Sequence, residues 1–478
     1  MKKHRGAKTV SLGLAALILF IGASHAQKGP KETFPYSPLN PIQMPGVEQA
    51  ELPNGLKIFL VEDHEIPTIN LQAVVRTGSV FESASKIGLA SLVGTTLRTG
   101  GTRSKTGDQI DKELDTLAAT VSSGIGSNAG TLAVSALKEN FDQALGILAE
   151  ILMEPAFSED KIELARLMQH TGISRRNENV SNIADREFGK LIYGKDSPYA
   201  RHPEHATIQA ITRQDIVDFY SAYYHPNNMW LSVCGDFNTR EMIGKITAAL
   251  GTWPRGRSSS EPWPAVRVQD RYAVHFIEKP DVNQSNILLG HIGGMMNNPD
   301  YPALSIMNQI LSFERMFKRI RTDEGLAYSV WGSYGAGYLH PGVFSCGAQT
   351  KSQSTVYAIE IMLKELKRIM EQEASDAELA RAKDGYLNSY VFNFETRSQV
   401  VDRMLAFAYY GYPIDFMEQI KSKVERVTKA DIQRVAQKYL KPDAVQILVV
   451  GKKEDFDKPL SSLGDVHVID IAIPPPQK

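Results

Sequence analysis

Two imidazoles lie close together in His202-Pro203-Glu204-His205, a spacing that could hold a metal ion. Histidine nitrogens are common zinc ligands, but a stable site takes three or four ligands, and no third one is evident near this segment. Pro203 also favours a loop over a regular helix. The segment is therefore interpreted as a solvated loop that holds no metal.

Two other patterns resemble fragments of known sites. Residues 124–129, Gly-Ile-Gly-Ser-Asn-Ala, loosely match a dinucleotide fingerprint, but strand-like residues 131–137 follow where that fingerprint requires a helix. Residues 83–86 (Ser-Ala-Ser-Lys) and 105–107 (Lys-Thr-Gly) match two elements of penicillin-recognising serine enzymes. No Ser-x-Asn element lies between them, and they are too close together for the strand that carries the second element. Neither pattern is interpreted as a site.

The first 26 residues have the pattern of a cleavable secretory signal. Four cationic residues lie within the first eight positions, before an apolar run over 10–23 and the small-x-small triplet 24–26. The run is shorter than the ~20 residues that span a bilayer, which disfavours the alternative of a membrane anchor. We expect cleavage after Ala26, an N-terminal extension over 27–44, and export to the periplasm without stable membrane insertion.

The charge balance disfavours some classes of partner. The 478 residues carry a formal net charge of −1, and removal of the four signal cations would leave −5, with no acidic or basic block. Nucleic acids and anionic membranes attract strongly basic surfaces, so neither is an expected partner.

The two cysteines, Cys234 and Cys346, both lie in apolar, strand-like runs. Two buried free thiols are the expected state. A disulfide stays open as the alternative, because an exported protein meets an oxidising compartment and spacing alone does not settle pairing.

The chain repeats itself at a constant offset. Residues 211–235 and 427–451 align without a gap at an offset of 216, so that Thr212 corresponds to Thr428. In each copy the Thr hydroxyl can cap a helix, and an Asp three positions later favours the positive end of that helix. A proline then ends the helix and a short apolar run suited to a buried strand follows. The repeat predicts two homologous domains.

Each domain is predicted to be α+β. Residues 56–61 and 69–75 are strand runs, whereas residues 87–97, 109–117, 140–152 and 160–176 have helical spacing. Strands segregated from helices suggest an antiparallel sheet with helices packed on one side. The expected boundaries are an N-terminal domain over 45–253, a linker rich in Pro, Ser and Arg over 254–264, a C-terminal domain over 265–455 and a tail over 456–478.

Collinear motifs across residues 45–455 resemble one family. Leu-Pro-Asn-Gly-Leu at 52–56, Arg-Thr-Gly-Ser at 76–79 and Gly-Leu-Ala at 88–90 are similar to the opening of the pitrilysin/insulinase zinc peptidases, in their bacterial and mitochondrial-processing branch. Tyr-His-Pro-Asn-Asn-Met at 224–229 and Arg-Ile-Arg-Thr-Asp-Glu-Gly-Leu-Ala-Tyr-Ser-Val at 319–330 continue the resemblance. It implies two domains that face each other like a clamshell.

The resemblance fails at the zinc motif. In active members Gly-Leu-Ala is followed by His-x-x-Glu-His, two ligands one helical turn apart and a Glu that activates the attacking water. The corresponding residues here are Ser91, Gly94 and Thr95, and the position of the third ligand, a Glu, corresponds best to Gly172. Neutral hydroxyls are poor zinc ligands and glycine offers no general base. We therefore expect no metal and no other cofactor in this chain.

The resemblance also implies a role for a second pair of residues. Such peptidases contribute an Arg and a Tyr, seven residues apart, from the C-terminal half to the substrate at the zinc of the other half, and Arg321 and Tyr328 match both types and spacing. Guanidinium and phenol groups can hold a carbonyl and stabilise an oxyanion. The alternatives are that Arg321 forms a surface ion pair and that Tyr328 is a core residue. Residues 311–317 lack the glycine-rich run of many related chains, which disfavours a substrate-capturing glycine loop here.

These expectations lead to one hypothesis and one alternative. The chain would be inactive alone and would supply Arg321 and Tyr328 to a homologous partner subunit that carries zinc and His-x-x-Glu-His, so that the pair forms a zinc endopeptidase. A peptide or unfolded protein would add as a strand to a sheet edge, with 120–127 as a candidate edge. The alternative is a catalytically dead scaffold or peptide-binding protein of the same fold.

Overall fold

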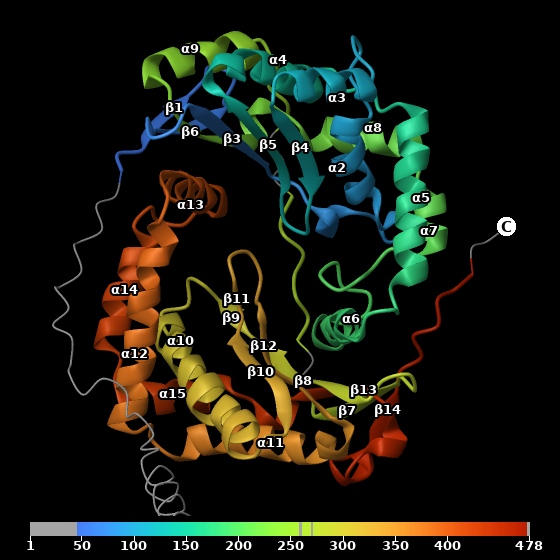
Figure 1. Ribbon diagram of the computed structural model, residues 1–478, viewed down its shortest axis with the longest axis vertical. Helices are drawn as coiled ribbons and strands as arrows, with labels where there is room; N and C mark the ends of the chain where they lie inside the picture. The colour runs from blue at the N-terminus through green and yellow to red at the C-terminus, as the bar shows by residue number, and fades with distance from the viewer. Residues whose placement is uncertain (1–44, 258–260, 269–270, 476–478) are drawn as a thin grey trace, which may run out of the picture. The chain divides into compact units, whose positions relative to one another are not determined.

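The computed structural model describes residues 45–257, 261–268 and 271–475 (Figure 1). The predicted signal peptide and the extension over 27–44 lie outside the described residues, as does part of the predicted linker. The described chain contains two six-stranded sheets, one from residues 48–235 and the other from residues 273–468.

The first sheet has the order β1-β2-β6-β3-β5-β4. Its pairs are antiparallel except for β2 and β6, which run parallel. A parallel pair requires a crossover, and most of this half of the chain lies between these two strands. The strands are β1 (Glu48–Glu51), β2 (Lys57–Glu62), β3 (Thr68–Val75), β4 (Thr120–Ile125), β5 (Gly130–Leu137) and β6 (Met229–Gly235).

The helices of the first half bury their apolar faces with this sheet in one large core. The predicted helices are confirmed to within two residues at each end. The cap at Thr212 is also confirmed, because its Oγ accepts from the Asp215 amide (3.2 Å) and Asp215 accepts from the Thr212 amide (2.8 Å). The helices are α2 (Leu89–Thr99), α3 (Gly107–Thr116), α4 (Phe141–Met153), α5 (Glu159–Arg175), α6 (Val180–Tyr193), α7 (His205–Gln209), α8 (Arg213–Tyr223) and α9 (Thr239–Leu250).

The second sheet has the order β10-β12-β8-β13-β7-β14, and five of its strands repeat the order of the first sheet, whereas the edge strand β14 comes from the end of its half and β1 from the start of its own. Thus β13 corresponds to β6, and β10 at one edge corresponds to β4. Here β7 runs parallel to both β13 and β14. The strands are β7 (Ala273–Glu278), β8 (Gln284–Ile292), β10 (Ala327–Tyr334), β12 (Val343–Lys351), β13 (Gln446–Gly451) and β14 (Val466–Val468); β9 (Gly294–Met295) and β11 (Ala336–Gly337) form a separate parallel pair.

The helices of the second half cover its sheet in the same way. Thr428 and Asp431 form the second capping box, as predicted. One helix of the second half differs from those described in the first half. Helix α10 (Tyr301–Gln309) continues into a π-helical segment over Ile310–Asp323. The other helices are α11 (Thr355–Glu371), α12 (Asp376–Tyr390), α13 (Arg397–Tyr410), α14 (Phe416–Arg426) and α15 (Lys429–Tyr439).

Each half also lends one helix to the sheet of the other half. Helix α13 packs on β2 and β6 of the first sheet, where Val401 and Leu405 are buried against Phe59 and Val61. Helix α6 packs on β8 and β13 of the second sheet, where Ile183 and other apolar residues join a second small cluster. Figure 1 shows α6 and α13 in these places. The two halves are therefore interlocked by apolar contacts.

The α+β class and the two-sheet architecture are confirmed, and three details differ from expectation. Both sheets are mixed, not antiparallel. Helices do not lie on one side only, because α6 and α13 cover the second faces. The expected tail over 456–478 contains β14, an edge strand of the second sheet. Cys234 and Cys346 are buried and free, as expected. Among the described residues, no helix has the length and apolar character needed to cross a membrane.

The interlocking predicts a stability effect that a matched pair of leucines can test. Leu405 on α13 is 2% exposed, whereas Leu164 on α5 is 52% exposed. Leu405→Ala should lower the free energy of unfolding by about 2–5 kcal/mol, because it removes buried methyl groups and leaves a cavity between α13 and the first sheet. Leu164→Ala should change it by less than about 0.5 kcal/mol. Urea unfolding of both variants tests this, and equal losses would mean that the α13 contact contributes little.

Candidate functional site

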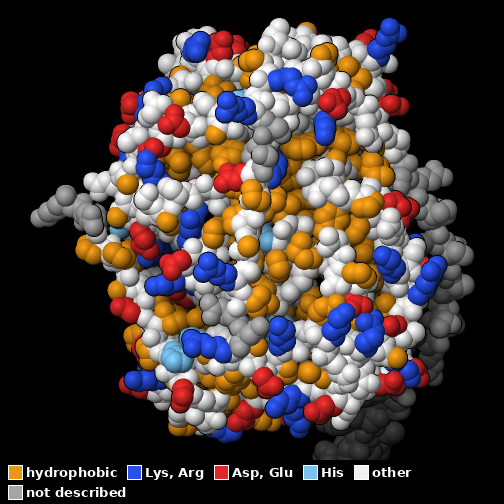
Figure 2. All heavy atoms as spheres, turned by 180° about the vertical axis from the view of Figure 1, so that it is seen from behind, with side chains coloured by type: hydrophobic (Ala, Val, Ile, Leu, Met, Phe, Trp, Pro, Cys, Tyr) orange, Lys and Arg blue, Asp and Glu red, His pale blue; other side chains and the backbone are white. Residues whose placement is uncertain are grey.

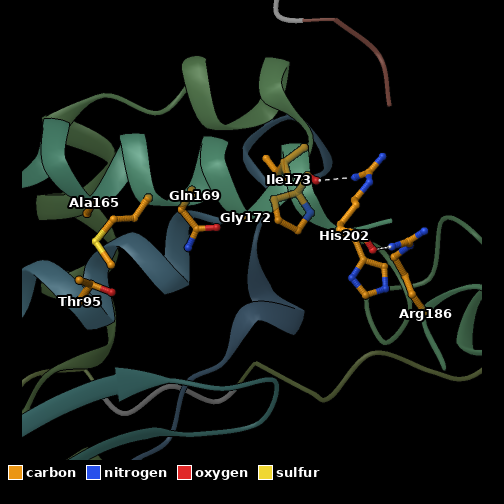
Figure 3. A pocket seen from close by; sticks show the side chains of 10 residues that line it. Thr95, Ala165, Gln169, Gly172, Ile173, Arg186 and His202 are labelled. Atoms are coloured by element: carbon orange, nitrogen blue, oxygen red, sulfur yellow. Dashed lines mark hydrogen bonds between the residues drawn. The ribbon is translucent and has the colours of Figure 1, made fainter. Parts of the chain in front are cut away.

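The four positions predicted to correspond to the zinc motif are brought together by α2 and α5. Ser91, Gly94 and Thr95 lie on α2, Gly172 lies on α5, and the two helices pack against each other. The side chain of Gln169 donates from Nε2 to Ser91 Oγ (2.6 Å) across this contact. Beside it lies a pocket of about 360 Å³ lined by Thr95, Gly172 and neighbouring residues (Figure 3).

These residues do not fit a zinc ion. The positions that correspond to the two imidazoles and the carboxylate hold Ser91, Thr95 and Gly172, which offer two neutral hydroxyls and no side chain. Within the described ranges, no three His, Cys, Asp or Glu side chains cluster closely enough to hold a metal.

Gly94 allows α2 to lie unusually close to the edge strand β4. A Cβ atom at position 94 would stand 2.5 Å from the Ile125 nitrogen and 2.8 Å from the Gly124 carbonyl carbon. Ser123 Oγ also donates to the Gly94 carbonyl (2.6 Å). A side chain at position 94 would therefore force α2 and β4 apart. Gly172 is different, because no atom lies within 4 Å of a Cβ built there.

One end of the pocket is cationic. Figure 3 shows Thr95 and Gln169 toward one end and His202 and Arg186 toward the other. Arg186 pairs with Glu187 (2.7 Å), and Arg176 pairs with Glu204 (2.9 Å). Burial, followed by the positive charges of Lys190, Arg186 and Arg176, lowers the pKa of His202 to about 4, so this imidazole is neutral near pH 7.

The candidate peptide edge is an edge strand of the first sheet, as predicted. Within the described chain, β4 pairs only with β5. Arg98 Nε donates to the Val121 carbonyl (3.1 Å) near the start of β4. An incoming strand could therefore pair with the later part of β4 without displacing that contact.

Arg321 and Tyr328 are also brought together. The Arg321 guanidinium carbon lies 5.5 Å from the centre of the Tyr328 ring and 5.2 Å from that of Phe317. Tyr328 sits in an irregularity of the edge strand β10, since Ala327 pairs with Thr350 and Ser329 pairs with Gln349. Its ring is 77% exposed. Neither side chain makes a hydrogen bond or an ion pair with another described residue. The alternatives of a surface ion pair for Arg321 and a core position for Tyr328 therefore do not apply.

Two features of these regions have no recognisable pattern in the sequence. Residues 311–317 are π-helical and expose Phe313, whereas only the absence of a glycine-rich run could be inferred. His170 Nδ1 lies 2.7 Å from His205 Nδ1, a pairing between residues 35 positions apart. His205 is buried and begins α7, so the interpretation of 202–205 as a solvated loop was wrong at this residue.

Comparison with known proteins decides the family. Residues 57–193 match the model of the insulinase family, peptidase family M16, and residues 210–386 match that of the peptidase M16 inactive domain. The chain belongs to the M16 family.

Curated relatives carry several kinds of name. A protein of Rickettsia felis named an uncharacterized zinc protease is 25% identical over 384 residues, which cover 78% of this chain and 90% of the relative. The non-peptidase homolog YmxG of Helicobacter pylori is 21% identical, with 85% and 94% covered. The beta subunit of the mitochondrial-processing peptidase of Saccharomyces cerevisiae is 22% identical, with 86% and 92% covered.

Solved structures confirm the fold. A peptidase M16 inactive domain from Pseudomonas fluorescens superposes with a TM-score of 0.77 at 22% identity and covers 87% of this chain and 100% of its own. The first half of the periplasmic protease PqqL from Escherichia coli gives 0.74 at 17% identity, with 86% and 92% covered.

The degenerate motif predicts a metal-free chain. After mild chelation and dialysis, the chain purified without residues 1–26 should contain far less than one zinc per molecule, because Ser91, Thr95 and Gly172 supply no zinc ligand of useful strength. Elemental analysis by mass spectrometry measures this, with an M16 protein that retains His-x-x-Glu-His as the positive control. About one zinc per chain under these conditions would overturn the prediction.

The two glycines of the degenerate motif should respond in opposite directions to the same substitution. Gly94→Ala should lower the free energy of unfolding by about 1–3 kcal/mol, because its Cβ would meet the backbone of β4. Gly172→Ala should raise it by up to about 1 kcal/mol, since alanine favours the helix and the space is open. Chemical denaturation of both variants measures the difference.

The contact between Gly94 and β4 also affects any attempt to restore the zinc motif by mutation. A variant with His at positions 91 and 95 and Glu at positions 94 and 172 should have little peptidase activity, because α2 must first move away from β4 and the partners that orient ligands are absent. Robust activity in that variant, or a stable Gly94→Ala protein, would contradict this account of the packing.

Proposed function

We propose that this chain is the non-zinc subunit of a two-chain M16 endopeptidase and supplies Arg321 and Tyr328 to a homologous, zinc-bearing partner. The observation that carries the proposal is the position of these two side chains. The Arg321 guanidinium lies over the rings of Phe317 and Tyr328, and Tyr328 lies on an edge strand, exposed and without a hydrogen-bond partner among the described residues.

The local structure supports a role outside the chain's own core. A tyrosine that only stabilised the fold would be buried, yet this ring is 77% exposed. Bulges on edge strands re-aim side chains and occur often beside active sites. Contacts between the cation and the two rings hold Arg321 without consuming its N–H donors. Those donors and the phenol could bind a substrate carbonyl as negative charge develops on its oxygen.

A peptide substrate is supported by the sheet edge and by the surface. β4 offers backbone groups for strand addition along residues 122–125. Figure 2 shows hydrophobic side chains gathered across the middle of one face, with cations and anions interspersed around them. Such a face suits contact with a peptide or a partner subunit better than contact with nucleic acid.

The proposed partner and compartment rest on relatives as well as on the sequence. One relative is named as the beta subunit of a processing peptidase, and one solved structure is the first half of a periplasmic protease. These names fit a homologous peptidase partner, and the N-terminal signal pattern fits the periplasm. In this proposal the zinc belongs to the partner and this chain holds no cofactor.

A scaffold or peptide-binding protein is the second candidate. It is favoured by the complete replacement of the zinc motif and by the close packing at Gly94, which leave the first half without hydrolytic chemistry. It would require no particular role for Arg321 or Tyr328. Mutation of these two residues therefore separates the candidates.

In the reconstituted pair, Tyr328→Phe should lower kcat by about 10²-fold or more with unchanged assembly, because one donor to the developing oxyanion is lost. Arg321→Lys should also lower kcat, since one ammonium cannot reproduce the planar set of guanidinium donors. The measurement is peptidase turnover by co-purified pairs with each variant.

Two matched variants control for surface effects. Tyr357→Phe removes an exposed hydroxyl that donates to Glu324, and Arg319→Lys changes a surface ion pair with Glu324. Both should retain wild-type turnover, and thermal melting checks that every variant is folded. If Tyr328→Phe and Arg321→Lys also retain wild-type turnover in an assembled pair, the scaffold is the correct function.

A further inference from the structure

The replacement of the zinc motif leaves open space on the α5 side of the pocket. Gly172 has no atom within 4 Å of a Cβ position, and it lines the pocket together with Thr95 and Gln169. A neighbouring hollow of about 630 Å³ shares Gly172, Arg176, Arg186 and His202 with the pocket, so the two form one groove. No carboxylate lines the pocket itself.

The cationic end of the groove also carries carboxylates. Arg186 and Lys190 pair with Glu187, Arg176 pairs with Glu204, and Asp185 lines the neighbouring hollow. The pocket itself is lined by Arg176 and Arg186 and by no carboxylate, which suits an anion there. The lowered pKa of His202 agrees with a positive potential at this point.

Hydrogen-bond donors for such an anion are also present. Arg176 Nε is buried and has no hydrogen-bond partner among the described residues. A buried donor without a partner is uncommon in folded proteins and indicates a missing acceptor. His202 makes no hydrogen bond within the described chain and can donate one from its neutral ring. Guanidinium groups match the planar geometry of a carboxylate.

The rest of the lining suits a peptide more than a free inorganic anion. Ala165, Met168, Ile173 and Pro203 give the groove an apolar wall that could hold a side chain. Thr95 joins the groove to α2, whose next residue toward the N-terminus, Gly94, touches the free-edge strand β4. A peptide backbone at β4 could therefore extend toward the cationic end of the groove.

We propose that this groove, at the position of the lost zinc motif, binds the carboxylate of a peptide, with Arg176, Arg186 and His202 as the binding residues. The carboxylate is that of a C-terminus or of an Asp or Glu side chain. The inference goes beyond the proposed function, because it uses neither Arg321 nor Tyr328 and predicts binding by this chain alone.

Fluorescence anisotropy of the purified chain tests the inference with three fluorescein-labelled valine/threonine peptides. One has a free C-terminal carboxylate, one is the matched C-terminal amide, and one is an amide with a central glutamate. At least one carboxylate peptide should bind ten-fold or more tightly than the neutral amide. Tight binding of the first indicates a C-terminal carboxylate as the ligand, and tight binding of the third indicates an acidic side chain.

Gly172→Glu places a competing carboxylate in the groove, one helical turn before Arg176, and should remove the preference for carboxylate peptides. Gly172→Gln is the matched neutral control and should largely keep it. Gly146→Glu, on α4 with equally open space, controls for added charge elsewhere. All three should melt no lower than the parent chain, since a helical glycine is replaced in each.

The inference is overturned if all three peptides bind the parent chain equally, or if the preference survives in Gly172→Glu. Because the assay contains no partner subunit and no turnover, its failure would leave the roles of Arg321 and Tyr328 untouched.

Discussion

Burial of both faces of each sheet is the constraint on which the rest of this structure depends. Every residue of β13 is buried, and six of the seven residues of β6 are buried as well. If helices covered only one face of a sheet, the side chains on the other face would be exposed to water. This exposure costs about 25 cal/mol of free energy for each Å² of apolar surface. Helices α6 and α13 supply the missing cover, each from the opposite half.

This exchange of helices also builds the cationic groove. Arg186 lies on α6, whose apolar residues Ile183 and Phe188 are fixed against the second sheet. Arg176, in contrast, directly follows α5, which packs on α2 in the first half. Arg186 Nη1 donates to the Arg176 carbonyl (3.0 Å), and Asn177 donates to the Ile471 carbonyl (2.6 Å) beyond β14. The residues that line the groove all belong to the first half, but the second sheet holds α6 in place, so the geometry of the groove depends on the interlocking of the halves.

Local patterns predicted the elements of the fold well, because the interactions that define those elements are local. Thr212 and Thr428 cap their helices through residues three positions away, and the spacing shows this directly. Parallel pairing of β2 with β6 depends on residues about 170 positions apart, and the sequence pattern of a strand does not reveal its neighbours. The destinations of α6 and α13 were missed for the same reason.

The same distinction between local and long-range interactions applies to the site. The replaced motif at Ser91, Gly94 and Thr95 was visible because it departs from a known spacing, as was the spacing of Arg321 and Tyr328. Phe317 beside Arg321 and the irregularity at Tyr328 depend on a π-helical segment and on pairing with β12, which hydrophobic periodicity does not predict. The groove at His202 is formed by α5, α6 and the loop before α7, and the sequence pattern does not show that these elements meet.

The two halves differ in where their backbones are irregular, and this difference bears on function. The replaced zinc motif lies on regular helices, and glycine at position 94 lets one of them settle against β4. The Arg321/Tyr328 region keeps a long π-helical segment, a bulged edge strand and exposed aromatic rings, all less stable than regular, buried alternatives. Departures from local regularity persist mainly where a function requires them. A chain that served only as a scaffold would be more stable with a regular and buried second region, so the contrast favours the proposed role of Arg321 and Tyr328.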